Sequence, residues 1–509
     1  FRAGIIYQIM NGYLPPQDPL FAGEVIRAPW GDLWLIAHVS TFFNKSPFIV
    51  FSVLNMCCLA AALYLIYLIS RQICNNQKAN ILSALTALFS ATPIGRWLLD
   101  YTGQRFRGWQ PELRAVPAFR KFPDICGDPL GIVFFCLFVY SIFQLYTQRP
   151  TLRTCAGLII SISGVVYFYT PFAPGIAIVS AGLILFHLFV FRHIHMQIPP
   201  VSSILLTVAL LITGMCFWPY WKTVSSGVGS QMELFSGASV LNHGFNVLLL
   251  TGFTAIIIGT QRQLLWRHSQ AKQLVLLFLI SGFLIIGYLF IHVPGTVEYK
   301  LLLLGGICCG IIGGMALYFL GEQKRWLAAG LFILFACPGF GHIYRFGFKY
   351  GDHPLKYGLS TVPVYEKGCD LHVSEPEEQQ MYDWIKASTP RSSKFLDTSL
   401  DIPVLAKRQL FIGLDRTDGK TESGYSISMK GFWIRNGYDL KAGEFRTAIA
   451  RNFYGYEDTL SRQNVLECLK QNDIFVVVRD NTDSMKVQTE GLEELFQSSA
   501  GRYRVFKVQ

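Results

Sequence analysis

The sequence predicts a polytopic α-helical membrane protein that ends in a soluble α/β domain. Two observations support this prediction. The 509 residues are 51% hydrophobic and only 15% charged, whereas soluble domains contain about 25% charged residues. Apolar runs that can cross a bilayer as helices, which takes about 20 residues or somewhat fewer, follow one another as far as residue 338. Beyond His342 the charged fraction rises and the apolar runs become short.

Ten apolar runs are expected to span the membrane. They lie at residues 47–69, 79–97, 128–146, 155–170, 174–191, 201–219, 245–260, 272–292, 300–320 and 325–338. Only the Pro-containing break at 170–175 separates the fourth run from the fifth, so these two runs are either two short spans or one kinked helix. Two spans agree better with the loop charges, because nearly all Lys and Arg of the short loops then fall on one side, which the positive-inside rule makes cytoplasmic.

The same charge pattern predicts which segments lie outside the cytoplasm. Residues 1–46, the loops at 98–127, 220–244 and 292–300, and everything after about 339 are expected on the exoplasmic side. The opening sequence has neither a basic leader nor a small-residue cleavage site. An exoplasmic start without a signal peptide implies one more span upstream of Phe1, which would make about eleven.

The chain divides into four regions by composition. Residues 1–46 form a first exoplasmic loop with interfacial helices, 47–338 the transmembrane domain, 339–373 a linker rich in Gly, Tyr and Lys, and 374–509 the soluble α/β domain. In the last region Ser374-Glu375-Pro376-Glu377 is typical of a helix start. Strands are expected at 394–396, 409–412, 473–478 and 503–508, and helices at 460–471 and 490–498.

Composition also excludes some functions. The net charge of +11 does not indicate nucleic-acid binding, because the basic residues are spread over short loops between apolar runs and form no single basic face. Most of the 12 cysteines lie inside apolar runs, where thiols behave as small hydrophobic groups, and no Cys/His spacing indicates zinc.

Three groups of charged residues at the exoplasmic surface are candidate sites. The first group, Asp18, Glu24 and Asp32, lies among prolines and glycines near the headgroup level. A carboxylate there can act as a base or as a ligand of a divalent metal ion, although no cofactor is required by the sequence. The alternative is an interfacial or re-entrant loop whose acids only cap turns.

The second group is basic and lies in the 98–127 loop, against the positive-inside trend. It contains Arg105, Arg107, Arg114, Arg120 and Lys121. Arg and Lys bind phosphate well, so a lipid-linked phosphate or pyrophosphate is the natural partner. The alternatives are attraction to anionic lipid headgroups and ion pairs with Glu112 and Asp124.

The third group is Glu298, Tyr299 and Lys300, at the start of the ninth span. A Glu and a Lys beside an otherwise uncharged helix are costly in lipid, so we expect them to face a cavity or each other. The alternative is a snorkelling Lys300 with Glu298 as its partner.

This architecture resembles the GT-C fold glycosyltransferases, membrane enzymes that move sugars from polyprenyl-phosphate carriers on the exoplasmic side. The resemblance covers the span number, the acid-bearing first exoplasmic loop, the basic residues of later exoplasmic loops and the α/β domain after the last span. The run from Glu377-Glu378 through Trp384-Ile385-Lys386-Ala387-Ser388-Thr389-Pro390 is also similar to a segment that often follows the last span in bacterial members.

The resemblance implies roles for the charged groups. A carboxylate, Asp18 or Glu24, would be the general base on the acceptor hydroxyl, with Asp32, Glu298 and Tyr299 in support. The carrier phosphate would be held by basic residues, namely Arg105, Arg107, Arg120, Lys121 and Lys300. Family members usually carry the key Asp directly after the first span, which here lies before Phe1, so a base upstream is the other interpretation.

The resemblance also implies partners and a location. The partners would be a polyprenyl-phosphate-linked sugar, membrane lipids and other membrane subunits, in the inner membrane with the C-terminal domain in the periplasm. Two alternatives to an enzyme are a noncatalytic subunit of a larger membrane complex and a transporter of a lipid-linked substrate. The spans disfavour the transporter, because His187 and Arg96 are almost their only ionisable groups.

Overall fold

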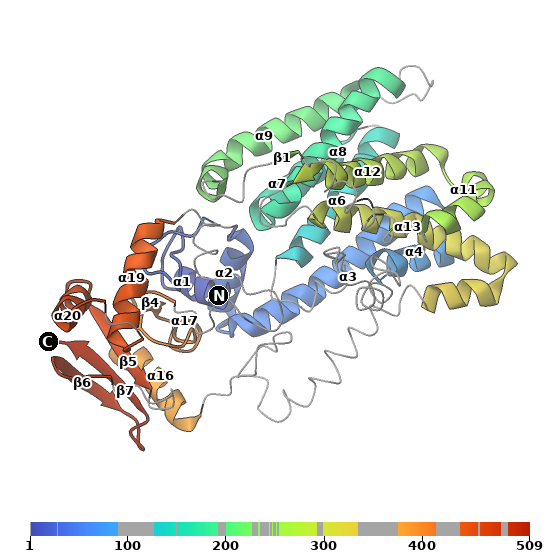
Figure 1. Cartoon of the computed structure of the whole chain (residues 1–509). Coiled ribbons are helices and arrows are strands. Elements are labelled where there is room, and N and C mark those ends of the chain that lie inside the picture. Colours follow the sequence, from blue (N-terminus) through green and yellow to red (C-terminus); the bar gives the residue numbers. More distant parts are fainter. Residues whose placement is uncertain are drawn as a thin grey trace. The chain divides into compact units, whose positions relative to one another are not determined.

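A computed structural model gives the fold of the chain (Figure 1). It describes residues 2–27, 29–89, 127–148, 150–191, 200–225, 233–234, 244, 247, 251, 254–292, 299–333, 375–413, 438–456, 459–479 and 487–509. The chain forms two compact units. One, called the mixed unit below, comprises residues 1–50, 223–229 and 352–509, and the other, the helical unit, comprises residues 51–222 and 230–351.

The helical unit is built mainly from apolar helices. Its elements are α3 (Pro47–Ile73, which begins in the mixed unit), α4 (Gln77–Phe89), α6 (Asp128–Thr147), α7 (Leu152–Phe168), η2 (Thr170–Phe172), α8 (Ala173–Phe186), η3 (His187–Phe191), α9 (Pro200–Ser225), β1 (Glu233–Leu234), α11 (Arg262–His268), α12 (Ala271–Phe290), β2 (Ile291–His292) and α13 (Tyr299–Gln323). Strands β1 and β2 pair antiparallel.

Six helices of the described residues are long and apolar enough to cross a membrane, at Pro47–Ile73, Asp128–Thr147, Thr170–Phe189, Val201–Tyr220, Ala271–Phe290 and Tyr299–Gln323, and Leu152–Phe168 is a shorter apolar helix. The protein is therefore a polytopic α-helical membrane protein. The break at 170–175 contains the 3-10 turn η2, which separates α7 from α8. The predicted spans 79–97, 245–260 and 325–338 fall partly outside the described residues, so the number of ten stays a prediction.

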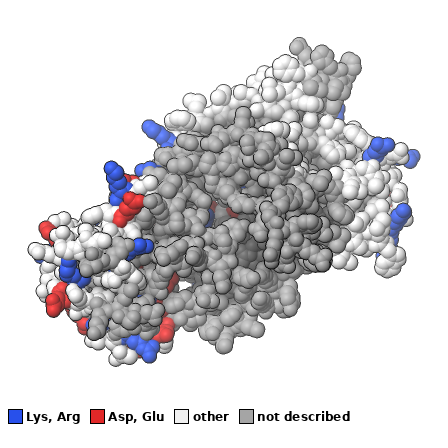
Figure 2. All heavy atoms as spheres, in the orientation of Figure 1, with Lys and Arg blue, Asp and Glu red and all other residues white. Residues whose placement is uncertain are grey.

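The charged surface agrees with a membrane protein. Figure 2 shows Lys, Arg, Asp and Glu scattered over the mixed unit. On the same face, the described surface of the helical unit is mostly uncharged, and Lys and Arg gather at one end, near α11. An uncharged surface bounded by basic groups is typical of helices that cross a bilayer.

Glycines bring α13 close to α4. A Cβ atom added to Gly310 would lie 2.6 Å from Cα of Ala87, and one added to Gly314 would lie 2.4 Å from Cα of Ser83. Small residues spaced four apart on both helices let the two backbones approach, which is a common way of packing helices in membranes. This contact fixes α13, whose first turn carries Lys300.

The mixed unit contains a five-stranded sheet with helices beside it. Its elements are α1 (Arg2–Met10), α2 (Gly31–Phe43), α16 (Pro376–Ser388), β3 (Lys394–Leu396), α17 (Ile402–Leu405), β4 (Gln409–Leu410), α19 (Leu440–Phe453), α20 (Arg462–Gln471), β5 (Ile474–Arg479), β6 (Leu492–Gln497) and β7 (Tyr503–Val508). The strand order is β4-β3-β5-β7-β6. Strands β4, β3 and β5 are parallel, and β7 pairs antiparallel with β5 and β6. The two faces of β5 enter separate apolar clusters, so this strand is buried on both sides, as predicted for its β-branched sequence.

The helix predicted at 490–498 is wrong. Residues Leu492–Gln497 form the edge strand β6, paired with β7 and interrupted by a bulge between Glu494 and Phe496. Gly491 has a φ of 79°, which does not belong to a right-handed helix. The Leu and Glu residues of this segment favour a helix by intrinsic propensity, but pairing with β7 determines the outcome.

Residues 16–26 of the first segment complete the sheet edge at β4. The N–H of Leu410 donates to the carbonyl of Pro19 at 2.9 Å, the N–H of Ala22 donates to the carbonyl of Leu410 at 2.9 Å, and the N–H of Gly413 donates to the carbonyl of Leu20 at 2.8 Å. The Phe21 side chain is fully buried in the core of the same unit. The loop therefore covers a strand edge that would otherwise be open to pairing with other chains.

Candidate functional site

Lys300 is an enclosed charge in the helical unit. It lies in the first turn of α13, with a relative exposure of 6%. Its ammonium group forms an ion pair with the carboxylate of Asp128. The same nitrogen lies 4.6 Å from the centre of the Tyr299 ring and 5.3 Å from that of Tyr169, both within the range of a cation–π contact. The sequence led us to expect that Lys300 faces a cavity or Glu298; its carboxylate partner in the structure is Asp128, and Glu298 lies outside the described residues.

Asp128 is the first residue of α6 and is also buried. Gly127 occupies the N-cap position and Pro129 the first turn, a combination that starts helices well. The N-terminus of a helix carries a partial positive charge, so it stabilises a carboxylate there and disfavours a cation. Asp128 is therefore well placed on α6, whereas Lys300 is at the unfavourable end of α13. The stability of α13 gives no reason for a lysine at this position.

Tyr169 is held in place by Gly131, one turn after Asp128. A Cβ atom on Gly131 would lie 2.7 Å from Cδ1 of Tyr169 and 2.9 Å from the ring of Phe172. The rings of Tyr169 and Phe172 meet edge to face, with their centres 4.7 Å apart. Only glycine leaves enough room for the Tyr169 ring against α6, where it meets the Lys300 ammonium.

This combination of groups suits an anion. A helix N-terminus presents backbone N–H groups and a positive dipole end, and Lys300 adds a full charge at the same place. Sulfate, phosphate and carboxylate groups are all bound at such sites, and the anion that meets Lys300 in this structure is the carboxylate of Asp128. Within the described ranges no three His, Cys, Asp or Glu side chains are grouped so that they could hold a metal ion.

The residues predicted in the second and third charged groups divide into two sets. Tyr299 and Lys300 lie together in the site, whereas the others fall outside the described residues: Arg105, Arg107, Arg120, Lys121 and Glu298. The sequence interpretation missed Asp128 and Tyr169. Asp128 had a usable signal, since it opens the span at 128–146 on the same predicted side as Lys300 and has the opposite charge.

Asp18, the first predicted base, is fully buried in the mixed unit. Its carboxylate accepts hydrogen bonds from the N–H of Leu20 at 2.7 Å and from the hydroxyl of Tyr438 at 2.8 Å. Burial raises the pKa of Asp18 to about 6, against the lowering effect of these bonds. The carboxylate thus fastens the first segment to the C-terminal part of the mixed unit.

The other two acids of the first segment, Glu24 and Asp32, differ in burial and in partners. The backbone carbonyl of Glu24 accepts the N–H of Asp18 at 2.7 Å, and the Glu24 residue is half-buried. Asp32, in the first turn of α2, is buried and forms an ion pair with Arg2 of α1. Burial raises the pKa of Asp32, and the Arg2 charge opposes that rise. Catalytic roles for Asp18 and Glu24 stay predictions.

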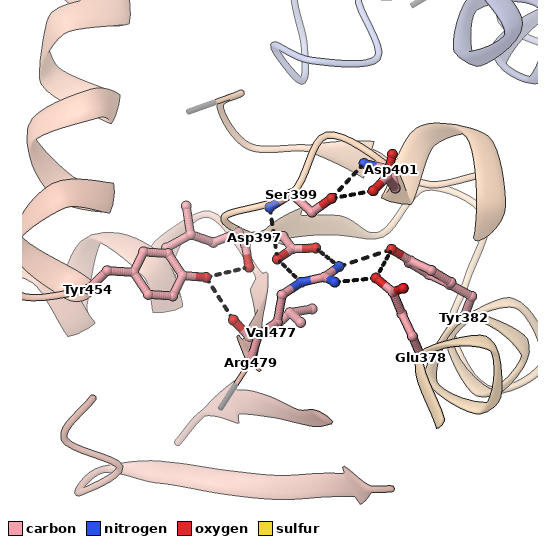
Figure 3. Close-up of polar contacts among 9 residues, drawn as sticks. Glu378, Tyr382, Asp397, Ser399, Asp401, Tyr454, Val477 and Arg479 are labelled. Carbon is pink, nitrogen blue, oxygen red and sulfur yellow. Dashed lines mark hydrogen bonds and ion pairs between the residues drawn. The ribbon is translucent and has the colours of Figure 1, made fainter. Parts of the chain in front are cut away.

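The mixed unit contains a second buried ionic cluster, shown in Figure 3, which the sequence interpretation did not find. Arg479, at the end of β5, donates from Nε and Nη2 to the two carboxylate oxygens of Asp397 at 2.8 and 2.6 Å. Arg479 also forms an ion pair with Glu378 and donates to the hydroxyl of Tyr382 at 3.0 Å. Burial alone would lower the pKa of Arg479, but the Asp397 carboxylate outweighs it and holds the pKa above its ordinary value.

Asp397 directly follows β3 and Arg479 is the last residue of β5, so both lie at the carboxyl ends of neighbouring parallel strands. In open α/β sheets that edge is the usual place for ligands. Here the carboxylates of Asp397 and Glu378 are both fully buried and bonded to Arg479. The described geometry therefore makes this cluster a structural tie between β3, β5 and α16.

Comparison with known proteins gives structural likenesses only. No protein-family model matches the chain, and no curated protein sequence matches it. Among solved structures, ArnT from Cupriavidus metallidurans bound to undecaprenyl phosphate has 9% identity and a TM-score of 0.49, over 99% of this chain and 92% of that one. The oligosaccharyltransferase of Archaeoglobus fulgidus in its apo form has 11% identity and a TM-score of 0.41, over 94% of this chain and 65% of that one. Both are GT-C fold glycosyltransferases, the group that the sequence resembles. At such identities the likeness assigns no residue role and no activity to this chain.

Proposed function

We propose that the chain is a membrane glycosyltransferase that moves a sugar from a polyprenyl-phosphate carrier to an acceptor on the exoplasmic face. The observation that supports this most is the position of Lys300: a buried cation at the N-terminus of an apolar helix, where it destabilises the helix and favours an anion. In this proposal the carrier phosphate binds to Lys300 and to the first-turn N–H groups of α13, while its polyprenyl chain lies along the apolar bundle.

The chemistry follows from that placement. The acceptor hydroxyl oxygen forms a bond to the anomeric carbon of the sugar, and the bond from that carbon to the phosphate oxygen breaks. The bonding electrons remain on the phosphate, and the proton of the hydroxyl passes to a carboxylate base. Lys300 stabilises the negative charge that develops on the phosphate. The base is predicted from the sequence to be Asp18 or Glu24, with Arg105, Arg107, Arg120 and Lys121 as further phosphate ligands.

The contact between residues 16–26 and β4 supports the proposed topology. The first segment precedes α3, and β4 follows the last predicted span, yet they belong to one folded unit. Both must then lie on the same side of the membrane, so the chain between them crosses it an even number of times, as ten spans require. We place that side outside the cytoplasm because of the loop charges, and we propose from the family resemblance that the membrane is the inner membrane.

The proposal is tested by carrier binding and by sugar transfer. We would purify the full chain in lipid nanodiscs, measure binding of undecaprenyl phosphate by native mass spectrometry, and measure release of polyprenyl phosphate from lipid-linked sugars. Lys300→Met should weaken binding at least tenfold and reduce transfer correspondingly. Lys324→Met is the matched control, because Lys324 is an exposed lysine beyond the other end of α13, and it should behave as the unmodified protein. Equal binding by Lys300→Met and Lys324→Met would contradict the proposal.

A noncatalytic subunit of a larger membrane complex is the second candidate. One observation favours it: the carboxylates of Asp18 and Asp32 are both buried and engaged in holding the fold. In that case the protein would bind the carrier but transfer no sugar from any lipid-linked donor. Transfer that is lost in Glu24→Gln or Asp18→Asn would exclude this candidate.

A further inference from the structure

We propose that Asp128 is the resident counter-ion of Lys300 and reserves this lysine for a phosphate monoester, the form that the carrier has after the sugar has left. With the sugar attached, the carrier phosphate is a diester with one negative charge, and Lys300 stays with Asp128. This inference rests on the proposed function, because it concerns the same lysine and the same phosphate.

Lys300 and Asp128 already form a close ion pair. Lys300 and Asp128 have relative exposures of 6% and 2%, and their charged groups are in direct contact. A phosphodiester offers Lys300 the same single charge that the Asp128 carboxylate already provides, so exchange gains little. A phosphate monoester carries up to two negative charges, and its attraction to the ammonium group increases in proportion.

When the pair opens, the charges of Asp128 and Lys300 each keep a favourable interaction. Asp128 is the first residue of α6, so its carboxylate keeps the favourable field of that helix N-terminus. Lys300 is in the first turn of α13, and a phosphate bound there neutralises both the lysine and the N-terminus of α13. Exchange thus leaves Asp128 with the field of its own helix N-terminus, so opening the pair costs less than isolating a buried carboxylate would.

The Lys300 ammonium group can change partners without leaving the aromatic rings beside it. Its nitrogen lies 4.6 Å from the ring centre of Tyr299 and 5.3 Å from that of Tyr169. Cation–π contacts of this kind depend weakly on direction, and the ammonium is a point charge on a flexible stem. Lys300 can therefore turn from the carboxylate to a phosphate while it remains against the rings, and Gly131 keeps the Tyr169 ring in place.

The consequence is that Lys300 acts late in the reaction. The bond between the anomeric carbon and the phosphate oxygen breaks, its electrons stay on the phosphate, and the phosphate gains one negative charge. The acceptor oxygen replaces that bond, and its proton passes to the carboxylate base. Because Lys300 moves to the phosphate as this charge develops, it stabilises the transition state and the product and adds little to donor binding.

The experiment is a double-mutant cycle on binding. The full chain in nanodiscs is titrated at pH 8 with two probes, undecaprenyl phosphate and its monomethyl phosphodiester, in the unmodified protein, Asp128→Asn, Lys300→Met and the double variant. In the presence of Asp128, Lys300→Met should weaken monoester binding at least tenfold and change diester binding less than threefold. In the Asp128→Asn background, Lys300→Met should weaken binding of both probes at least tenfold.

A measurement that needs no Asp128 variant keeps the inference testable if Asp128→Asn does not fold. Between pH 5 and pH 8 the monoester gains its second charge, with a pKa of about 6. Monoester affinity of the unmodified protein should rise over this range, diester affinity should stay flat, and Lys300→Met should remove most of the rise.

The outcomes separate the two proposals. If Lys300→Met weakens diester and monoester binding equally in the presence of Asp128, the counter-ion inference is overturned while the proposed function stands. If neither probe binds in a Lys300-dependent way, the proposed function itself fails. If the expected contrast appears in a protein that transfers no sugar, the selectivity inference holds and the catalytic assignment fails.

Discussion

Arg479 and Lys300 are both buried cations, but their surroundings differ. Arg479 is fixed by a two-point bond to Asp397, an ion pair with Glu378 and a hydrogen bond to Tyr382 (Figure 3). Lys300 has one carboxylate partner within the described part of the chain, Asp128, and two aromatic rings. A planar guanidinium held at several points cannot turn without losing them all, whereas a lysine ammonium can change partners. The first arrangement suits a structural tie, and the second suits a ligand site.

The largest effect should come from removing the Arg479 charge. Arg479→Met leaves Asp397 and Glu378 buried without their cation, and we expect the free energy of unfolding of the mixed unit to fall by about 3–5 kcal/mol. Pulse proteolysis of the mixed unit measures this. Arg502→Met is the control, since Arg502 and Glu375 form a half-exposed ion pair at 3.3 Å that should contribute less than about 1 kcal/mol. Equal losses in the two variants would show that the buried cluster is not a structural tie.

Asp18 differs from the carboxylates beside Arg479 and Lys300, because it accepts hydrogen bonds from uncharged donors, the Leu20 N–H and the Tyr438 hydroxyl. Its pKa of about 6 exceeds the ordinary value of 3.8, so the folded protein holds the proton more tightly than the unfolded chain does. The contribution of Asp18 to stability is therefore greatest below about pH 4, falls as the pH rises to about 6, and stays low above that. At 1.36 kcal/mol for each pKa unit, the change is about 2–3 kcal/mol.

The measurement for Asp18 is a difference between two proteins. Pulse proteolysis from pH 4 to pH 8 on the unmodified protein and on Asp18→Asn cancels the contributions that the two proteins share, including those of the neighbouring groups Tyr438, Glu24, Arg27 and Arg446. The stability difference should vary with pH in the stated direction. A difference that is independent of pH would mean that Asp18 stays ionised in the fold and that its pKa is not raised.

Lys300 should tolerate removal better than Arg479. Lys300→Met leaves Asp128 at the N-terminus of α6, where the helix dipole still stabilises the carboxylate. We expect a loss of about 1–2 kcal/mol, and less than about 1 kcal/mol when Asp128→Asn is added, because no buried charge then remains. Thermal unfolding in nanodiscs gives the order of the variants. A loss as large as that of Arg479→Met would assign the Lys300 pair a structural role.

Sequence reasoning found local features and missed contacts between distant residues. The six long apolar helices, the start of α16 and the strand β3 follow from apolar length, Pro376 and β-propensity, all of which depend on nearby sequence. Asp128 and Lys300 are 172 positions apart, and Glu378 and Arg479 are 101 apart. The predicted topology places Asp128 and Lys300 on the same side of the membrane, but a single sequence does not select these pairs, because many other charges are available. The strand β6 was missed for a related reason, since its pairing with β7 overrides a local sequence that favours a helix.

The smallest effect concerns the backbone beside the Arg479 cluster. The Tyr454 hydroxyl from α19 lies 3.0 Å from the carbonyl of Leu396 and 2.8 Å from that of Val477, on the neighbouring strands β3 and β5 that lead to Asp397 and Arg479. Tyr454→Phe removes the donor but keeps the ring in the core, so the free energy of unfolding should fall by about 1 kcal/mol. The matched control is Tyr456→Phe, because Tyr456 is exposed, and it should be neutral within about 0.5 kcal/mol. Equal losses of unfolding free energy in Tyr454→Phe and Arg479→Met would contradict this order. They would mean that the hydrogen bonds of the Tyr454 hydroxyl to the backbone carbonyls hold β3 and β5 together as strongly as the Arg479 ion pairs do.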